Sequence, residues 1–307
     1  MAYNQFPLQD VVPGDPQPYH RQMRNSWFAV WRPALGTLAI LCGWIIITVI
    51  CVLPIQALDP EAAKKVGWEM LLATNLSLAA LIPLSLGMAK FLHQQPSGLL
   101  SSLKPGLRWR PLAIFLIAAV VVEVAMLGVA LLLPVDFATE VSGKADDATA
   151  IIVVVLLTST FQAAGEEYFF RGYLLQAFGS IMRSPIVPIL LTALIFTLFH
   201  GVWPWESLAL FFDRFAFGVL AGWLVVRTGG LEAAIAVHAV NNIITFIFAA
   251  MTDSVTESLG ITDAPWSLVL VDIAKFVLFA AIGLWIARKL DLQRTARVAL
   301  PPLAKPV

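Results

Sequence analysis

Residues 148–172 read ATAIIVVVLLTSTFQAAGEEYFFRG, an uncharged run that ends in two adjacent carboxylates and an arginine. A charged side chain in the hydrocarbon core of a membrane costs a few kcal/mol, so such residues indicate a functional site. On a helix, Glu167 and Arg171 are four residues apart and share a face, which predicts an ion pair. Glu166 points about 100° away from Glu167, and no arginine has that spacing to it. The pattern predicts that Glu167 is structural and that Glu166 is available for chemistry.

The composition of the whole chain is that of an all-α membrane protein. Hydrophobic residues make up 59% of the 307 residues and charged residues only 13%, whereas soluble domains average about 25% charged residues. The formal net charge of zero gives no argument for a nucleic-acid partner. Apolar runs long enough to span a lipid bilayer recur along the chain. We expect a polytopic protein with about eight transmembrane helices, near residues 34–56, 68–92, 111–134, 148–180, 186–201, 206–226, 231–251 and 266–287.

These runs divide the chain into four expected parts. Residues 1–32 are polar and rich in proline, which predicts a disordered cytoplasmic tail. Residues 33–109 hold the N-terminal transmembrane helices, and residues 110–251 form the expected catalytic membrane core. Residues 252–307 hold the last transmembrane helix and a basic cytoplasmic tail. The first apolar run begins too late and is too long for a cleavable signal peptide, so we expect it to be a retained span.

Lysine and arginine are distributed unevenly among the connections between these runs. Both terminal segments and every second connection are basic. The other connections are acidic and hold only Lys64, Lys65 and Lys144 as basic residues. Because positively charged loops stay in the cytoplasm, the pattern predicts that both termini are cytoplasmic.

Two further apolar runs carry polar side chains. His200 ends one run, and His238 and Asn242 share a helix face in another. At about 1.5 Å of rise per residue, these side chains and Glu166 fall in overlapping layers of the membrane. A lone intramembrane histidine or asparagine is often only a hydrogen-bond partner between helices. The two glutamates also fit a helix end at the membrane surface. Together, however, a carboxylate and a histidine can activate water, and a second histidine and an amide can stabilise an oxyanion.

Three motifs follow one another along these runs: Glu-Glu-x-x-x-Arg at 166–171, Phe-x-x-x-His at 196–200 and His-x-x-x-Asn at 238–242. Their order and separations resemble those of the CAAX prenyl protease and bacteriocin-processing family, also called the Abi family, over about residues 110–250. The resemblance implies an intramembrane endopeptidase without a cofactor, in a bacterial inner membrane. Its substrate would be a membrane-embedded or membrane-associated protein or peptide.

The resemblance also implies roles for the residues of the motifs. Glu166 and His200 would activate the hydrolytic water. His238 and Asn242 would stabilise the oxyanion. The remaining glutamate and arginine of the first motif would hold the helix in place. Asn241 lies about 100° round the helix from Asn242, so we expect it to face elsewhere.

Two other interpretations remain open. Glu166, His200 and His238 could be three ligands of a zinc protease, although the usual His-Glu-x-x-His pattern is absent from the sequence. A non-catalytic immunity or scaffold protein, or a small transporter that uses buried charges as a relay, would also explain the polar groups. A transporter would more often show an internal repeat or paired broken helices, and neither is visible.

Further charges fall within apolar runs, and we expect them to be structural. Asp272 and Lys275 are three residues apart and can pair on a helix. Arg214 could pair with Glu123 or contact the site. The complete set of these additional charged residues is Glu123, Asp213, Arg214, Asp272 and Lys275.

Overall fold

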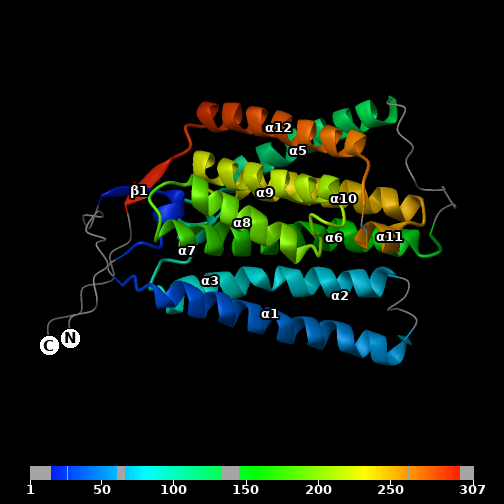
Figure 1. Cartoon of the computed structure of the whole chain (residues 1–307), viewed down its shortest axis with the longest axis horizontal. Coiled ribbons are helices and arrows are strands. Elements are labelled where there is room, and N and C mark those ends of the chain that lie inside the picture. The colour runs from blue at the N-terminus through cyan, green and yellow to red at the C-terminus, as the bar shows by residue number, and fades with distance from the viewer. Residues whose placement is uncertain (1–14, 26, 61–65, 133–144, 261–262, 298–307) are drawn as a thin grey trace.

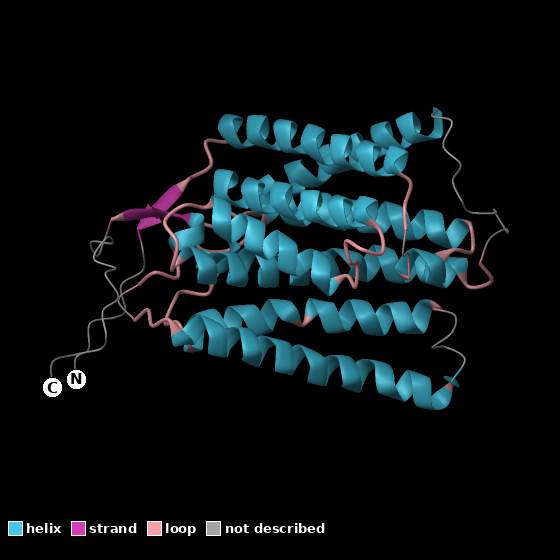
Figure 2. Cartoon of the chain, viewed as in Figure 1, coloured by secondary structure: helices cyan, strands magenta, loops and turns pink. Residues whose placement is uncertain are grey.

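The computed structural model describes residues 15–25, 27–60, 66–132, 145–260 and 263–297. Long helices lie side by side along one axis, and both termini lie at the same end of the bundle (Figures 1 and 2). The larger helices are α1 (Trp31–Leu58), α2 (Trp68–Ala79), α3 (Leu81–Phe91), α5 (Trp109–Leu132), α6 (Ala148–Glu167), α8 (Ile186–Phe199), α9 (Leu208–Thr228), α10 (Glu232–Met251) and α12 (Trp266–Lys289). Short helices are α4 (Gly98–Ser101), α7 (Leu175–Gly179), α11 (Val255–Leu259) and a turn η1 (Tyr19–Arg21).

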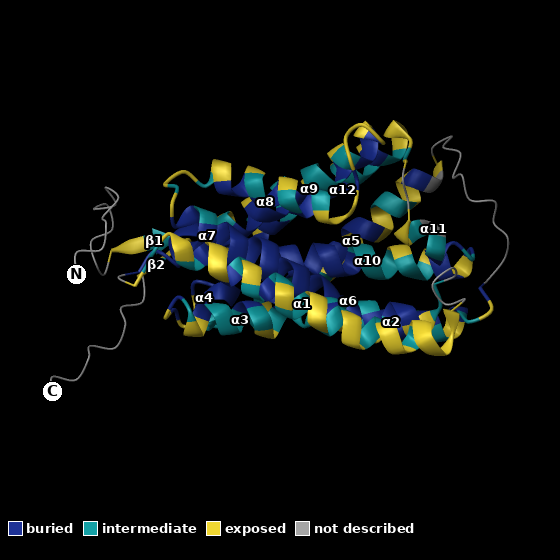
Figure 3. Cartoon of the chain, turned by 60° about the horizontal axis from the view of Figure 1, so that its bottom comes forward, coloured by how far each residue is buried: buried dark blue, intermediate teal, exposed yellow. Residues whose placement is uncertain are grey.

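The prediction of an all-α polytopic membrane protein is confirmed. Within the described residues, seven helical segments are long and apolar enough to cross a membrane. Their surfaces show why. In α1 only Pro33, Gly36 and Ile40 are buried, and large aliphatic side chains are exposed along the helix. Figure 3 colours the exposed residues of α1 yellow. Such an outward-facing apolar surface requires lipid around it, since water would disfavour it.

Seven of the eight expected spans correspond to these segments. The remaining one, near residues 186–201, is α8, whose 14 residues correspond to about 21 Å of rise, whereas a bilayer core is about 30 Å thick. The helix stops early because Gly201, with φ of 69°, adopts the left-handed conformation that ends helices. His200 therefore lies at a helix end part-way along the bundle, where it is exposed.

The helix that carries the two glutamates runs continuously from Ala148 to Gly179, as the sequence predicted. Its middle portion, Tyr168–Leu174, is a wider π-helical segment called η3. Such segments are uncommon and occur frequently at functional sites. The helix packs against α2 and α10. At Gly165 it approaches the preceding helices so closely that a side chain would overlap the backbone carbonyl oxygen of Leu78.

The end of the bundle that holds both termini is closed by the chain itself. Strand β1 (Pro16–Pro18) pairs antiparallel with β2 (Thr295–Arg297). The segment that follows, residues 19–25, is buried throughout and packs against α7 and α9. The Tyr19 hydroxyl donates a hydrogen bond to the carbonyl oxygen of Leu100.

The sequence predicted a disordered tail over residues 1–32, and for residues 15–25 this is wrong. Pro16 and Pro18 occupy an extended strand, a conformation that suits proline, and the large side chains of Tyr19 and Met23 are fully buried. Gly179 makes the packing possible, because a side chain there would overlap the carbonyl group of His20. Residues 1–14 and 26 lie outside the described part of the chain.

Gly165→Ala tests the close approach next to the glutamates. The new methyl group meets backbone, which cannot move aside as a side chain can, so overpacking should destabilise the protein by about 1–3 kcal/mol. Gly87→Ala is the matched control, because nothing lies within 4 Å of the position that its methyl group would take. That substitution should leave stability unchanged or raise it by up to about 1 kcal/mol. Thermal unfolding of both variants in detergent measures the difference; equal melting temperatures would contradict the packing argument.

Candidate active site

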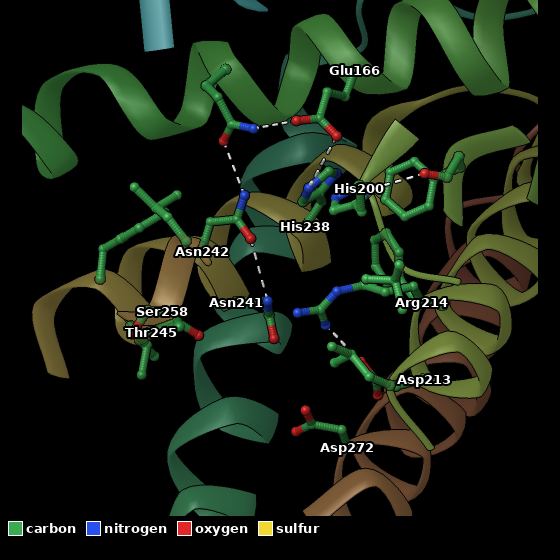
Figure 4. A pocket seen from close by; sticks show the side chains of 18 of the residues that line it. Glu166, His200, Asp213, Arg214, His238, Asn241, Asn242, Thr245, Ser258 and Asp272 are labelled. Atoms are coloured by element: carbon green, nitrogen blue, oxygen red, sulfur yellow. Dashed lines mark hydrogen bonds and ion pairs between the residues drawn. The ribbon is translucent and has the colours of Figure 1, made fainter. Parts of the chain in front are cut away.

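A cavity of about 660 Å³ lies between the helices and brings the sequence motifs together. Glu166 from α6, His200 from the end of α8, and His238 and Asn242 from α10 all line it. Figure 4 shows these four side chains facing one another across the cavity. Their convergence follows from the helix positions: α10 packs directly against α6, and α8 ends where its terminal histidine reaches the same space.

The ion pair predicted from the first motif is present. Arg171 Nη1 lies 2.8 Å from Glu167 Oε1, and both side chains are completely buried. The guanidinium also lies 4.1 Å from the centre of the Phe196 ring and 5.3 Å from that of Phe217, which places it in cation–π contact with α8 and α9. The same Glu167 oxygen accepts a hydrogen bond of 2.7 Å from His238 Nδ1. This array joins four helical segments.

Glu166 has a different environment. Its Oε1 accepts a hydrogen bond from Gln162 Nε2, one turn earlier on the same helix. Gln162 in turn accepts a hydrogen bond of 3.0 Å from Asn242 Nδ2. The second oxygen, Oε2, is buried without a hydrogen-bond partner and lies 3.9 Å from His238 Nε2. Among the described residues, one oxygen of Glu166 therefore has a hydrogen-bond partner and the other has none.

Gln162 was not singled out from the sequence. It joins the carboxylate of the first motif to the amide of the third, so it belongs to the candidate site. Its signal is a spacing: it stands four residues before Glu166, which places both on one helix face. Because the same run also holds serine and threonine, the sequence alone does not distinguish a glutamine in a site from one that only packs between helices.

The two histidines present different ring nitrogens to the cavity. His200 Nδ1 lies 2.8 Å from the carbonyl oxygen of Phe196; because a carbonyl only accepts, this nitrogen carries the proton and Nε2 keeps its lone pair. The His200 ring also lies 4.4 Å from the Phe196 ring, centre to centre. In His238 the nitrogen next to Glu167 likewise donates, and Nε2 points towards Glu166.

A second polar cluster occupies the opposite wall of the same cavity. Lys275 donates hydrogen bonds of 3.0 Å to Glu123 and 2.8 Å to Asn241, and it lies 3.0 Å from Asp272. Asp213 pairs with its neighbour Arg214 at 2.6 Å. The predicted pairing of Asp272 with Lys275 is thus present, whereas Glu123 pairs with the lysine instead of Arg214.

The expected orientation of Asn241 is wrong. It lines the cavity together with Asn242, donates to the Asn242 side-chain oxygen at 3.3 Å, and accepts from Lys275. The two asparagines do lie about 100° apart round the helix, but the cavity is wide enough for both side chains to line it. A continuous hydrogen-bonded chain therefore leads from Lys275 through the asparagines and Gln162 to Glu166.

The arrangement can support acid–base chemistry. A carboxylate oxygen of Glu166, an imidazole lone pair of His200 and the side-chain amide of Asn242 face one cavity, and water activation and oxyanion stabilisation use groups of these kinds. Within the residues that the structure describes, no group of three or more histidine, cysteine, aspartate or glutamate side chains is placed to hold a metal ion.

Glu167→Gln tests the supporting array. The substitution leaves the buried Arg171 without its charged partner, and breaking a buried ion pair typically destabilises by about 3–5 kcal/mol. Asp272→Asn is the control, since the Asp272 side chain is 42% exposed and Lys275 keeps Glu123; a loss of at most about 1 kcal/mol is expected. Thermal unfolding in detergent measures both. Similar small losses for the two variants would contradict a supporting role for Glu167.

Comparisons with known proteins concern the segment that holds the three motifs. Residues 148–244 match the family described as "Type II CAAX prenyl endopeptidase Rce1-like", and all three motifs lie within that segment. The uncharacterized protein YyaK of Bacillus subtilis (strain 168) is 28% identical over 151 residues, which cover 45% of this chain and 49% of YyaK, about half of that relative's length. No solved structure matches the chain. Residues 148–244, about a third of the chain, are therefore similar to the Rce1-like CAAX prenyl endopeptidases.

Proposed function

We propose that the chain is an intramembrane endopeptidase in which Glu166 and His200 activate a water molecule for attack on a peptide bond. The observation that carries this proposal is the unpartnered Oε2 of Glu166, which lies at a cavity shared with His200, His238 and Asn242. An unpaired buried carboxylate oxygen costs free energy unless water or substrate occupies the site. The match of residues 148–244 to an endopeptidase family supports the same reaction.

The first step is deprotonation of water. Gln162 fixes Oε1 of Glu166, so Oε2 is the oxygen that receives the proton. The lone pair on His200 Nε2, left free by the bond from Nδ1 to Phe196, accepts a hydrogen bond from the same water and orients it. The hydroxide then attacks the carbonyl carbon of the peptide bond, and the carbonyl oxygen becomes an oxyanion.

His238 and Asn242 stabilise the oxyanion through hydrogen bonds. Because His238 Nδ1 donates to Glu167, Nε2 can donate to the oxyanion only if the ring is doubly protonated. Asn242 gives one N–H to Gln162 and keeps its second N–H for the oxyanion.

Collapse of the intermediate completes the reaction. The proton on Glu166 moves to the amide nitrogen, the carbon–nitrogen bond breaks, and the products are a carboxylate and an amine. The water supplies the oxygen and hydrogens that the two products gain. No covalent bond to the protein is formed at any stage, so the site needs no nucleophilic serine or cysteine.

Glu166→Gln tests the base. The amide keeps the shape of the side chain but cannot accept the proton, so cleavage should fall to the background rate while the melting temperature stays within a few degrees. Cleavage of a purified substrate in nanodiscs measures the loss. Parallel reactions with a metal chelator, with metal analysis of the purified protein, test the zinc alternative. Full activity of the variant would refute the proposed base, and loss of wild-type activity on chelation would favour zinc.

Asn242→Ala tests oxyanion stabilisation. Removing one donor typically lowers the rate about 100- to 1,000-fold, and because the charge exists only in the transition state, KM should change little. Asn75→Ala is the control: Asn75 also lines the cavity, but its hydrogen bonds go to Thr158 and Ser159. Single-turnover cleavage and thermal stability are measured for both variants. Equal rate losses that follow stability alone would favour a scaffold over an enzyme.

A further inference from the structure

The cavity is asymmetric along the bundle. From the motif residues it extends towards the end that is remote from both chain termini, where α11 and the start of α12 lie (Figure 1). Ser258 and Leu259 of α11 line it there, together with Ala264 and Leu268. Leu259 is also 46% exposed, so this part of the lining reaches the molecular surface. None of the described residues of α4, α7 or residues 15–25 lines the cavity.

The opposite end is closed by tightly bonded chain. Gln22 is fully buried and donates to the backbone carbonyl groups of both Gln17 and Ala296, which ties it to both strands of the terminal ribbon. Asn25 donates to the carbonyl oxygen of His93 at 2.9 Å, and the His93 ring lies 2.8 Å from the Tyr173 hydroxyl. Burial lowers the pKa of His93 to about 4, so the ring stays neutral and bonded at neutral pH.

Polar groups mark a route from the open end to the site. The exposed carboxylate of Asp272 stands one helical turn from the mouth-lining Leu268. It leads to Lys275, and from there the chain of hydrogen bonds runs through the asparagines to Gln162 and Glu166. On the opposite side, α2 supplies Leu71 and Leu78 beside the polar Thr74 and Asn75, and α1 adds the apolar Leu41 and Trp44. Water can therefore follow the charged wall, while the apolar side chains of the opposite side contact an apolar peptide segment.

The charges of the two ends assign them to sides of the membrane. The end that holds the termini is basic, with Arg24, Lys104, Arg110, Arg183, Arg227 and Lys289. The end where the cavity opens carries the acidic residues Asp147, Asp253 and Asp263 instead. The positive-inside rule therefore places the closed end in the cytoplasm and the mouth on the other side.

We infer that the cavity takes its substrate from the extracytoplasmic side of the membrane. The substrate class is a polypeptide segment with apolar side chains, exposed at the outer leaflet, as in an exported or membrane-anchored protein. The term substrate rests on the proposed function, whereas the side from which the cavity is entered does not depend on it. A cytoplasmic peptide would meet the closed end, where buried chain separates it from Glu166.

Accessibility of single cysteines to a membrane-impermeant maleimide in intact cells tests this. Cys42 and Cys51 are first replaced by serine. Thr245→Cys places a thiol inside the cavity, one turn beyond Asn241, and Ser258→Cys places one at its mouth. Ser184→Cys, in the exposed connection before α8 at the closed end, is the matched control. These near-isosteric changes are checked for folding by size-exclusion profile in detergent.

The expected result is that the Thr245→Cys and Ser258→Cys variants react equally before and after cells are permeabilised. The Ser184→Cys variant should react only afterwards. Reaction of the Thr245→Cys variant only after permeabilisation, or not at all, would overturn the proposal, as would reaction of the Ser184→Cys variant in intact cells. Because labelling needs no cleavage, these outcomes stay distinct from a failure of the endopeptidase assignment, which the activity of the Glu166→Gln variant decides.

Discussion

The contact on which the rest of the structure depends is the buried array of Arg171, Glu167 and His238. Removing a guanidinium from water is unfavourable by several kcal/mol unless its charge is paired and hydrogen-bonded. Here α6 supplies the glutamate, α10 the imidazole, and α8 and α9 the aromatic rings that cover the cation. Since each helix contributes one partner, a shift of any of them leaves a buried charge exposed to hydrocarbon. The array thus fixes the relative positions of the helices that form the cavity.

The two adjacent glutamates have different environments in this arrangement. Both oxygens of Glu167 are buried, and one accepts two hydrogen bonds, so that residue is committed to structure. Glu166, about 100° round the helix, faces the cavity and is steadied by Gln162 alone. The wider turns of η3 begin directly after the pair. Helical phase, more than the identity of the side chains, separates a supporting carboxylate from an available one.

Much of this could be predicted from the sequence, because hydropathy and helical spacing are local properties. The apolar runs gave the helix positions to within a few residues, and the spacing of Glu167 and Arg171 gave their ion pair. What failed depends on distant contacts. The burial of Tyr19 needs α7 and α9, and the pairing of Glu123 with Lys275 joins residues 152 positions apart. The early end of α8 is a local exception, because it follows from the left-handed backbone of Gly201.

The short helix α8 has a consequence for the lipid beside it. Its outer surface is apolar, with Ile186, Val187 and Leu190 exposed, yet it covers about 21 Å where acyl chains extend about 30 Å. Lipid next to α8 must therefore thin, and headgroups and water must dip towards His200. Hydrophobic mismatch built into one helix would thus deform the bilayer locally and hydrate the layer that holds His200. The membrane itself, thinned at this point, would become part of the environment that admits water to the cavity.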